Sequence, residues 1–167
     1  TSHDVEGLGN ERLYNYLKNQ GIVEKEKYIK LAFVCLLTAV GIPMIFAGEE
    51  FADKHDLSPE EARDKQVDPV NYERLKDGWR KEIFSYVARL VRLRTTAKAL
   101  AINDVNFIHA DFDEGKRVVV WKRGRGKDLV IVVANFSEYN SPEDGEYFVP
   151  HWPTKPADKQ WWEVTKN

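Results

Sequence analysis

The sequence Gly41-Ile42-Pro43-Met44-Ile45-Phe46-Ala47-Gly48-Glu49-Glu50-Phe51 decides the fold that we expect for this chain. Residues 42–47 are apolar or small and lie between two glycines. Such a short run with β-branched and aromatic side chains predicts a strand buried on both faces. Pro43 fits near its first position, where a missing N–H matters least. Glu49 and Glu50 follow the strand, and in parallel α/β folds chemistry occurs at the carboxyl ends of strands.

Helices are expected on both sides of this strand. Residues 11–19 predict a short helix, and residues 24–40 predict a longer one that is almost wholly apolar after a charged first turn. A helix without a polar face must be covered on more than one side, so it belongs to a core. Residues 79–94 predict an amphipathic helix from the i, i+3, i+4, i+7 spacing of apolar side chains. Its apolar face is formed by Ile83, Phe84, Val87, Leu90 and Val91.

Residues 51–77 are highly charged and lack apolar periodicity. Ser58-Pro59-Glu60-Glu61 predicts a helix start, with proline at the first position and acids in the first turn. A loop this long inside a compact domain is usually functional or disordered. His55 and Asp56 stand close to Asp53 in the sequence, which suggests a metal site, but we favour a solvated charged loop and predict no metal.

Beyond residues 95–103 the apolar periodicity changes from that of a helix to that of a strand. The segments with a period of two are 105–112, 117–123, 129–136, 147–149 and 161–164. Residues 113–116 and 124–128 have the composition of hairpin loops. The pattern predicts an antiparallel meander that folds as a small sandwich, with a domain boundary within residues 96–104.

Composition excludes some classes of function. Lys and Arg total 25 and Asp and Glu total 27, a net charge of -2 that argues against a nucleic-acid partner. No apolar run is long enough to span a bilayer, so we expect no membrane partner. Cys35 is the one cysteine, and we expect it to be a buried small hydrophobe. A single cysteine favours the cytoplasm, although the localisation stays open.

Several stretches follow one another in an order that is typical of one enzyme family. They are His3-Asp4, Ile29-Lys30-Leu31-Ala32-Phe33, the strand of residues 41–51, Leu90-Val91-Arg92-Leu93-Arg94 and Val133-Ala134-Asn135-Phe136-Ser137. Together they resemble the last part of the α-amylase family, glycoside hydrolase family 13. The resemblance covers essentially the whole chain, and its most specific part is the Gly-Ile-Pro-x-Ile-x-x-Gly-Glu-Glu-Phe strand behind a His-Asp pair.

The resemblance implies an α+β chain with two parts. The family combines a (β/α)8 barrel with an antiparallel β-domain called domain C. Residues 1–98 would be the C-terminal part of the catalytic barrel, its last two β/α units, and residues 99–167 would be domain C. Residues 1–4 would then end the seventh strand, residues 42–47 would form the eighth, and residues 79–94 would be the closing helix.

The resemblance also assigns roles to individual residues. A retaining glycosidase uses a nucleophile and an acid/base about 5–5.5 Å apart, and the family carries both on strands that would precede this chain. Asp4 would be the third, catalytic carboxylate, which stabilises the charge that develops at the sugar. His3 would bind the same sugar. A carboxylate at a barrel mouth either contacts substrate or pairs with an arginine to hold the rim together; we favour the rim role for Glu49 and leave Glu50 open. The family often has Asn where this chain has Val5, which affects the local substrate contacts.

The function implied is that of the C-terminal portion of a retaining α-glucan-active hydrolase or transglycosylase, inactive by itself and without a cofactor. Its partners would be an α-glucan or oligosaccharide substrate and a missing N-terminal barrel portion. Thr1 is not an initiator methionine, so we expect the natural N-terminus to lie upstream. Apolar surfaces that lack their neighbours would then favour self-association.

Two other classes of function stay open. The first is a non-catalytic carbohydrate-binding or structural β-module, in which tryptophans stack on sugar rings. The candidates are Trp121, Trp152, Trp161 and Trp162, although tryptophans in a small β-domain more often pack internally. The second is a metal-dependent phosphohydrolase that uses His-Asp pairs. It would need more His and Asp ligands on helices than a chain with 4 histidines in loops offers.

Overall fold

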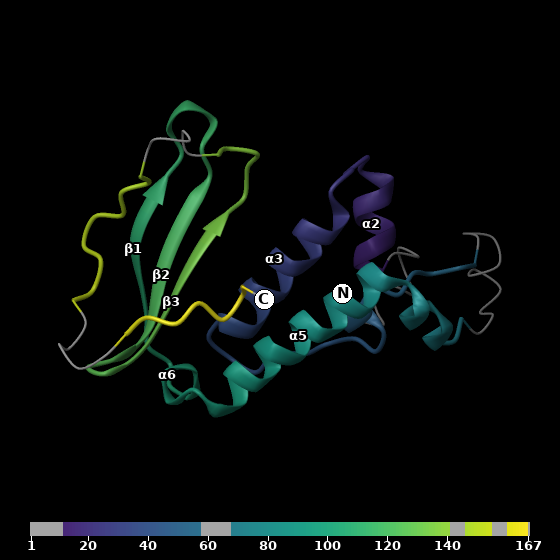
Figure 1. Cartoon of the computed structure of the whole chain (residues 1–167), viewed down its shortest axis with the longest axis horizontal. Helices are drawn as coiled ribbons and strands as arrows, with labels where there is room; N and C mark the ends of the chain where they lie inside the picture. Colours follow the sequence, from purple (N-terminus) through teal and green to yellow (C-terminus); the bar gives the residue numbers. More distant parts are fainter. Residues whose placement is uncertain (1–11, 58–67, 141–145, 155–159, 167) are drawn as a thin grey trace. The chain divides into compact units, whose positions relative to one another are not determined.

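The computed structural model describes a mixed α+β chain that divides into two compact units (Figure 1). The described residues are 12–57, 68–140, 146–154 and 160–166. The first unit, called the helical unit here, comprises Thr1–Leu37 and Ile42–Arg92. The second, called the sheet unit, comprises Thr38–Gly41 and Leu93–Asn167. None of the helices in the described residues is long and apolar enough to cross a membrane.

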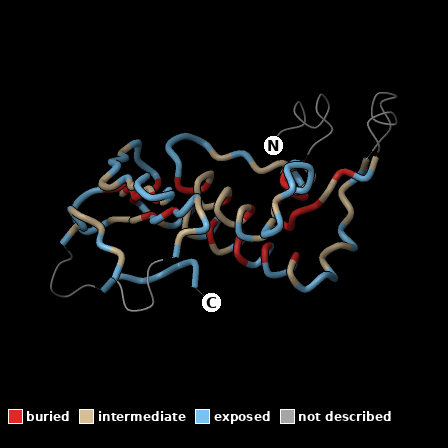
Figure 2. Tube along the Cα trace, turned by 90° about the horizontal axis from the view of Figure 1, so that it is seen from above, coloured by how far each residue is buried: buried red, intermediate tan, exposed pale blue. Residues whose placement is uncertain are grey.

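The helical unit confirms the helices predicted from periodicity. They are α2 (Leu13–Asn19), α3 (Lys25–Thr38) and α5 (Gly78–Thr96), and a short 3-10 helix, η2 (Tyr72–Lys76), precedes α5. Buried apolar side chains recur along these helices with exposed positions between them (Figure 2). The shared core contains Leu17, Ile29, Phe33, Leu37, Ala52, Ile83, Tyr86, Val87 and Leu90.

The apolar face predicted for α5 is only partly buried. Ile83, Val87 and Leu90 lie in the core, as the i, i+4, i+7 spacing predicts. Phe84 is 42% exposed and Val91 is 36% exposed, although both were placed on the same face. Phe84 and Val91 are seven positions apart, so they lie along one line of the helix surface, next to the line of buried side chains.

The strand predicted at residues 42–47 is absent, and this prediction was wrong. The segment has no strand structure, and Ile42 and Met44 are 98% and 60% exposed. A strand exists only through hydrogen bonds to a neighbouring strand, and a parallel one needs further layers on both faces. The described residues of the helical unit contain no strand that could pair with this segment. Its sequence therefore has strand character without a sheet to join.

The sheet unit is built on three antiparallel strands in the order β1-β2-β3. They are β1 (Val105–Asp111), β2 (Val118–Arg125) and β3 (Asp128–Asn135), which confirms three of the predicted strands and both predicted turns. A register shift lies between Phe107 and His109, where β1 pairs with β2. Gly126 has φ 59° in the β2–β3 turn, a conformation that glycine adopts without strain.

The remaining predicted strands are not formed. Residues 147–149 and 161–164 have no strand structure, so the described residues make one open sheet rather than a sandwich. Both segments are short, and short runs of alternating residues acquire strand structure only where a partner fixes their register. The prediction of strands at these two places was therefore wrong.

A buried arginine organises the sheet unit. Arg123 in β2 is 1% exposed, and its Nε donates to the carbonyl of Asp104 at 2.9 Å. Its other nitrogens donate to the carbonyls of Thr38, Ala39, Leu100 and Ile102. Thr38 is the last residue of α3 and Ala39 follows it, while Leu100 lies in α6 (Lys98–Ala101) and Ile102 follows that helix. One guanidinium thus gathers three chain segments, since its fixed fork offers five N–H donors.

Candidate functional site

Several buried polar side chains of the helical unit meet around the turn that follows residue 47. This turn contains a 3-10 helix, η1 (Glu49–Phe51), flanked by Gly48 at φ 94° and Ala52 at φ 58°. The N–H of Asp53 donates to the carbonyl of Gly48 at 2.9 Å. A Cβ at position 48 would lie 2.9 Å from both Nη1 of Arg12 and Cβ of Asp53. Only glycine therefore fits where the chain reverses.

Glu49, the residue predicted at the rim, is 4% exposed. Its Oε1 accepts a hydrogen bond of 3.1 Å from the N–H of Leu13, the first residue of α2. A carboxylate there satisfies an unpaired helix N–H and suits the positive end of the helix dipole. Arg12 donates to the carbonyl of Ala47 at 2.6 Å, and its guanidinium lies 4.8 Å from the ring centre of Phe46. Glu49 is thus held in place, while its role at a barrel rim stays a prediction.

Arg74 links two carboxylates of the following loop. It donates to Asp53, which is 1% exposed, and to Asp56, and it donates to the carbonyl of Lys54 at 3.0 Å. Asp53 also accepts from the N–H of Asn71 at 3.1 Å. Burial alone would raise the pKa of Asp56, but hydrogen bonds from Arg74 and Lys54 outweigh burial and lower it. The same pairing raises the pKa of Arg74 against the opposing effect of its burial.

His55 lies inside this contact network. It is 9% exposed, and its Nδ1 pairs with the carboxylate of Asp68. The backbone N–H of His55 donates to Oδ1 of Asn15 at 2.7 Å, and Nδ2 of Asn15 donates to the backbone carbonyl of His55 at 3.0 Å. Asp68 also accepts from the N–H of Asp56 at 3.0 Å. The prediction of a solvated charged loop was therefore wrong for Asp53 and His55, whose partners lie too far along the sequence for a local pattern to reveal them.

Arg80 completes the surroundings of the turn. It is 4% exposed, donates to the carbonyl of Ala52 and pairs with Asp77 through Nε at 3.2 Å. Its guanidinium lies 4.4 Å from the ring centre of Trp79 and 5.0 Å from that of Tyr14. Burial lowers the pKa of Arg80. Contacts of this kind are typical of buried arginine, which stacks on aromatic rings while its N–H groups bind oxygen.

The chemistry open to this cluster follows from its pairing. Asp53 and Asp56 are bound by arginine and Glu49 by a backbone N–H, so these carboxylates are suited to holding chain segments together. A general base must have its proton acceptor within reach of a substrate, whereas Glu49 and Asp53 are buried within the chain. No group of three or more His, Cys, Asp or Glu side chains that could hold a metal ion occurs within residues 12–57, 68–140, 146–154 and 160–166.

The two predicted sugar-contacting residues cannot be placed in this cluster. His3 and Asp4, like the neighbouring Val5 and the helix start predicted at residues 58–61, lie outside the described residues. Glu50 is described, and its Oε2 accepts a hydrogen bond of 2.8 Å from the N–H of Gly48. The three arginines around the turn were missed by sequence reasoning. Arg12 and Arg80 are buried and the Arg74 side chain is 12% exposed, and no local sequence signal distinguished these three from surface arginines.

The structure thus shows an α+β chain in which the turn after residue 47 leads into a loop whose carboxylates, Asp53 and Asp56, are bound by Arg74. One relative gives this description a context: a cyclomaltodextrinase from Geobacillus thermopakistaniensis (strain MAS1) is 32% identical over 109 residues. The match covers 65% of this chain and 17% of the relative, so the chain spans about a sixth of that enzyme. This is a distant, partial relation to a glycoside hydrolase of the α-amylase family. No protein-family model and no solved structure matches the chain.

Proposed function

We propose that the chain is the C-terminal portion of a retaining, α-glucan-active glycoside hydrolase or transglycosylase of the α-amylase family. Residues 1–98 would belong to its barrel and residues 99–167 to its domain C. The observation that carries the proposal is the 32% identity to a cyclomaltodextrinase over 109 residues. The ordered set of family-like motifs agrees with it, because single short motifs often match by chance whereas an ordered set rarely does.

In this proposal Asp4 acts on the transition state and His3 binds the sugar ring. A carboxylate fixed beside the developing positive charge lowers the barrier because it needs no reorganisation during the reaction. Retaining hydrolysis also needs a nucleophile and an acid/base on opposite sides of the scissile bond. Glu49 and Asp53 are buried and hydrogen-bonded within the chain, so neither is suited to those roles. The chain alone should therefore be inactive on α-glucosidic bonds.

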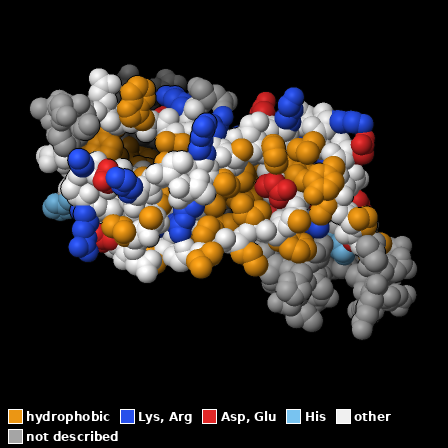
Figure 3. Space-filling view, turned by 90° about the horizontal axis from the view of Figure 1, so that it is seen from below, with side chains coloured by type: hydrophobic (Ala, Val, Ile, Leu, Met, Phe, Trp, Pro, Cys, Tyr) orange, Lys and Arg blue, Asp and Glu red, His pale blue; other side chains and the backbone are white. Residues whose placement is uncertain are grey.

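Two exposed apolar side chains within residues 42–47 support the preceding barrel portion as the partner. Ile42 and Met44 are 98% and 60% exposed, a costly arrangement for large apolar side chains. Figure 3 shows hydrophobic side chains at the surface of each unit, with Lys, Arg, Asp and Glu side chains between them. An added strand would pair with the main-chain groups of this segment, and the layers on the two faces of the resulting sheet would cover its side chains. We propose the preceding barrel portion as the source of that strand.

The test is complementation of two purified portions. The chain is incubated with starch, pullulan and an activated aryl α-glucoside, with and without a separately expressed portion encoded upstream. We expect turnover only in the mixture. Asp4→Asn should lower kcat at least about a hundredfold with little change in substrate binding, because the lost charge acts mainly on the transition state.

Two results would decide against this proposal. Turnover by the chain alone that is abolished by Asp4→Ala would show that the chain carries a complete site. Near-normal kcat in the Asp4→Asn mixture would remove Asp4 from the mechanism. Glucan binding without turnover in any mixture would favour the alternative function, a non-catalytic carbohydrate-binding module.

A further inference from the structure

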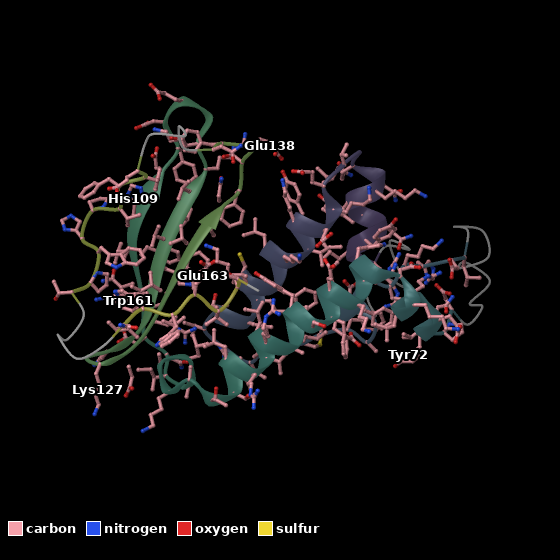
Figure 4. The ribbon with its side chains drawn as sticks, in the orientation of Figure 1. Tyr72, His109, Lys127, Glu138, Trp161 and Glu163 are labelled. Atoms are coloured by element: carbon pink, nitrogen blue, oxygen red, sulfur yellow. The ribbon has the colours of Figure 1, made fainter. Side chains whose placement is uncertain are left out.

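One end of the sheet carries titratable side chains that the proposed function does not use. Asp111, Val118 and Asn135 form a row across the three strands, because Asp111 pairs with Val118 and Val118 pairs with Asn135. His109 lies two positions before Asp111 in β1, so both side chains are on the same face of the strand. Figure 4 labels His109 on this strand. An imidazole and a carboxylate are thus neighbours on β1.

The hydroxyl of Tyr147 lies between these two groups. Nε2 of His109 is 2.8 Å from the hydroxyl oxygen, and the hydroxyl donates to Oδ2 of Asp111 at 2.9 Å. The rings of Tyr147 and His109 also meet edge to face, with their centres 5.7 Å apart. Residues 146–149 have no strand structure, so side-chain contacts rather than a ladder of main-chain hydrogen bonds attach this segment to β1.

Further side chains face Tyr147 and Asp111 from other segments. The ring of Tyr139, which follows β3, meets the Tyr147 ring edge to face at 6.3 Å. Nζ of Lys116, in the turn between β1 and β2, lies 3.6 Å from Oδ2 of Asp111 and 3.8 Å from Oε2 of Glu114. The same ammonium group lies 5.4 Å from the ring centre of Tyr139. Groups from β1, from the β1–β2 turn and from the chain after β3 therefore surround Tyr147.

The two hydrogen bonds of the Tyr147 hydroxyl can run in one direction only. Loss of solvation would raise the pKa of Asp111, but hydrogen bonds from Tyr147 and from the N–H of Asp113 outweigh it and lower that pKa, so the carboxyl is ionised at neutral pH. An ionised carboxylate only accepts, so the single O–H of Tyr147 is used in the bond to Asp111. The Tyr147 oxygen is then the acceptor for His109, and Nε2 of His109 must carry a hydrogen.

We propose that residues 146–149 form a strap that an ordered chain of two hydrogen bonds holds closed over β1. Nε2–H of His109 donates to Tyr147, and Tyr147 donates to Asp111. Nδ1 of His109 can gain or lose a proton without breaking either bond, so the strap depends on the charge of Asp111 rather than on that of His109. Bonds that run in one direction also polarise each other. The strap is independent of the proposed function, because it needs no substrate and no other portion of an enzyme.

The direction of the chain is tested by nuclear magnetic resonance on the full chain with isotope-labelled histidine. Long-range proton–nitrogen spectra distinguish a ring nitrogen that carries a hydrogen from one that does not. The chain has 4 histidines, and the signals that His109→Gln removes belong to His109. At a pH where the ring is neutral, we expect hydrogen on Nε2 and none on Nδ1. A His109 ring with its hydrogen on Nδ1 would overturn the proposal.

Asp111→Asn gives the decisive comparison. Oδ1 of Asp111 accepts from the N–H of Asp113 at 3.1 Å, so the amide oxygen of the variant is kept there and its NH2 group takes the place of Oδ2. The NH2 group donates to the Tyr147 oxygen, and the O–H of Tyr147 turns to His109. We therefore expect the His109 hydrogen to move from Nε2 to Nδ1. Asp113→Asn is the matched control, because it removes the same charge from an exposed position and should leave Nε2–H unchanged. An unchanged Nε2–H in Asp111→Asn would overturn the ordered chain.

Tyr147→Phe tests the strap itself, since it removes one hydroxyl and keeps the ring. Phe148 is 80% exposed, and chymotrypsin cuts after it only when the surrounding residues leave the sheet and extend into the protease. We expect this cut to be at least about tenfold faster in Tyr147→Phe, because both hydrogen bonds are lost. Tyr139→Phe is the matched control and should stay within about twofold of the unmodified chain. Equal rates in the two variants, measured by mass spectrometry of the fragments, would overturn the strap.

Discussion

The guanidinium of Arg74 binds the carboxylate of Asp53, a side chain that is 1% exposed, across 21 positions of sequence. The same guanidinium binds Asp56, whose side chain is 42% exposed. One arginine therefore pairs with a buried and a half-exposed carboxylate, and these two ion pairs differ in what their loss should cost. Removing one partner of a buried pair leaves an uncompensated charge, whereas an exposed partner is replaced by water.

Asp53→Asn should destabilise the helical unit by about 2 kcal/mol or more, because the buried Asp53 carboxylate accepts from both Arg74 and the N–H of Asn71. Asp56→Asn is the matched control and should cost less than about 1 kcal/mol. The free energies of unfolding are measured by urea denaturation followed by circular dichroism. Equal losses in the two variants would contradict the distinction between buried and exposed partners.

The ionisation of Tyr147 should depend on the contact of its hydroxyl with the sheet. Its hydroxyl donates to Oδ2 of Asp111 in β1 at 2.9 Å, and Nε2 of His109 lies 2.8 Å from the same hydroxyl. Burial, followed by the bond to Asp111, raises the pKa of Tyr147 from 10.0 to about 12. A group whose pKa is raised by folding contributes stability that is complete below its unfolded pKa and is lost as pH rises through its folded pKa.

Thermal stability should therefore decline between about pH 10 and pH 12, in parallel with the ionisation of one late-titrating tyrosine. Absorbance at alkaline pH follows that ionisation, and thermal melts follow the stability. Tyr147→Phe should remove the late step from the titration and the corresponding part of the stability loss. A titration in which Tyr147→Phe leaves the late step in place would assign it to another tyrosine.

Arg123→Met should disrupt the sheet unit, because it removes a guanidinium donor from the carbonyls of the buried residues Thr38 and Leu100. We expect a loss of about 3 kcal/mol or more, since each unsatisfied buried group costs about 1–3 kcal/mol. Arg125→Met is the control on the same strand: its side chain is 81% exposed and pairs with Asp104 at 2.5 Å. Chemical denaturation compares the two variants, and similar losses would refute the special role of Arg123.

The exposed segment at residues 42–46 should cause self-association of the isolated chain. Ile42→Lys/Met44→Lys should shift the chain toward the monomer, because two charges would replace apolar side chains that favour burial. Val23→Lys is the control, since Val23 is 86% exposed but lies outside this segment. Sedimentation velocity over a range of concentrations measures the shift. An unmodified chain that is monomeric throughout, or an equal effect of Val23→Lys, would count against association through residues 42–46.

The sequence by itself determined the elements whose patterns are long and local. Residues 79–94 carried a helical period over several turns, and α5 forms there because a helix makes its hydrogen bonds within its own segment. The strands β1 to β3 were also predictable, because hairpin turns pair neighbouring strands without distant partners. The family resemblance likewise depends on residue order alone, and the cyclomaltodextrinase match supports a distant relation.

Only the tertiary structure decided what depends on distant partners. Residues 42–47 have the composition of a buried strand, yet strand structure requires a second chain segment that composition cannot supply. Asp53 and His55 were expected to lie in a solvated loop, and they are buried because carbonyls, amides and opposite charges from remote segments surround them. Burying a polar group is favourable only where such partners converge, and that convergence is a property of the folded chain rather than of any local sequence.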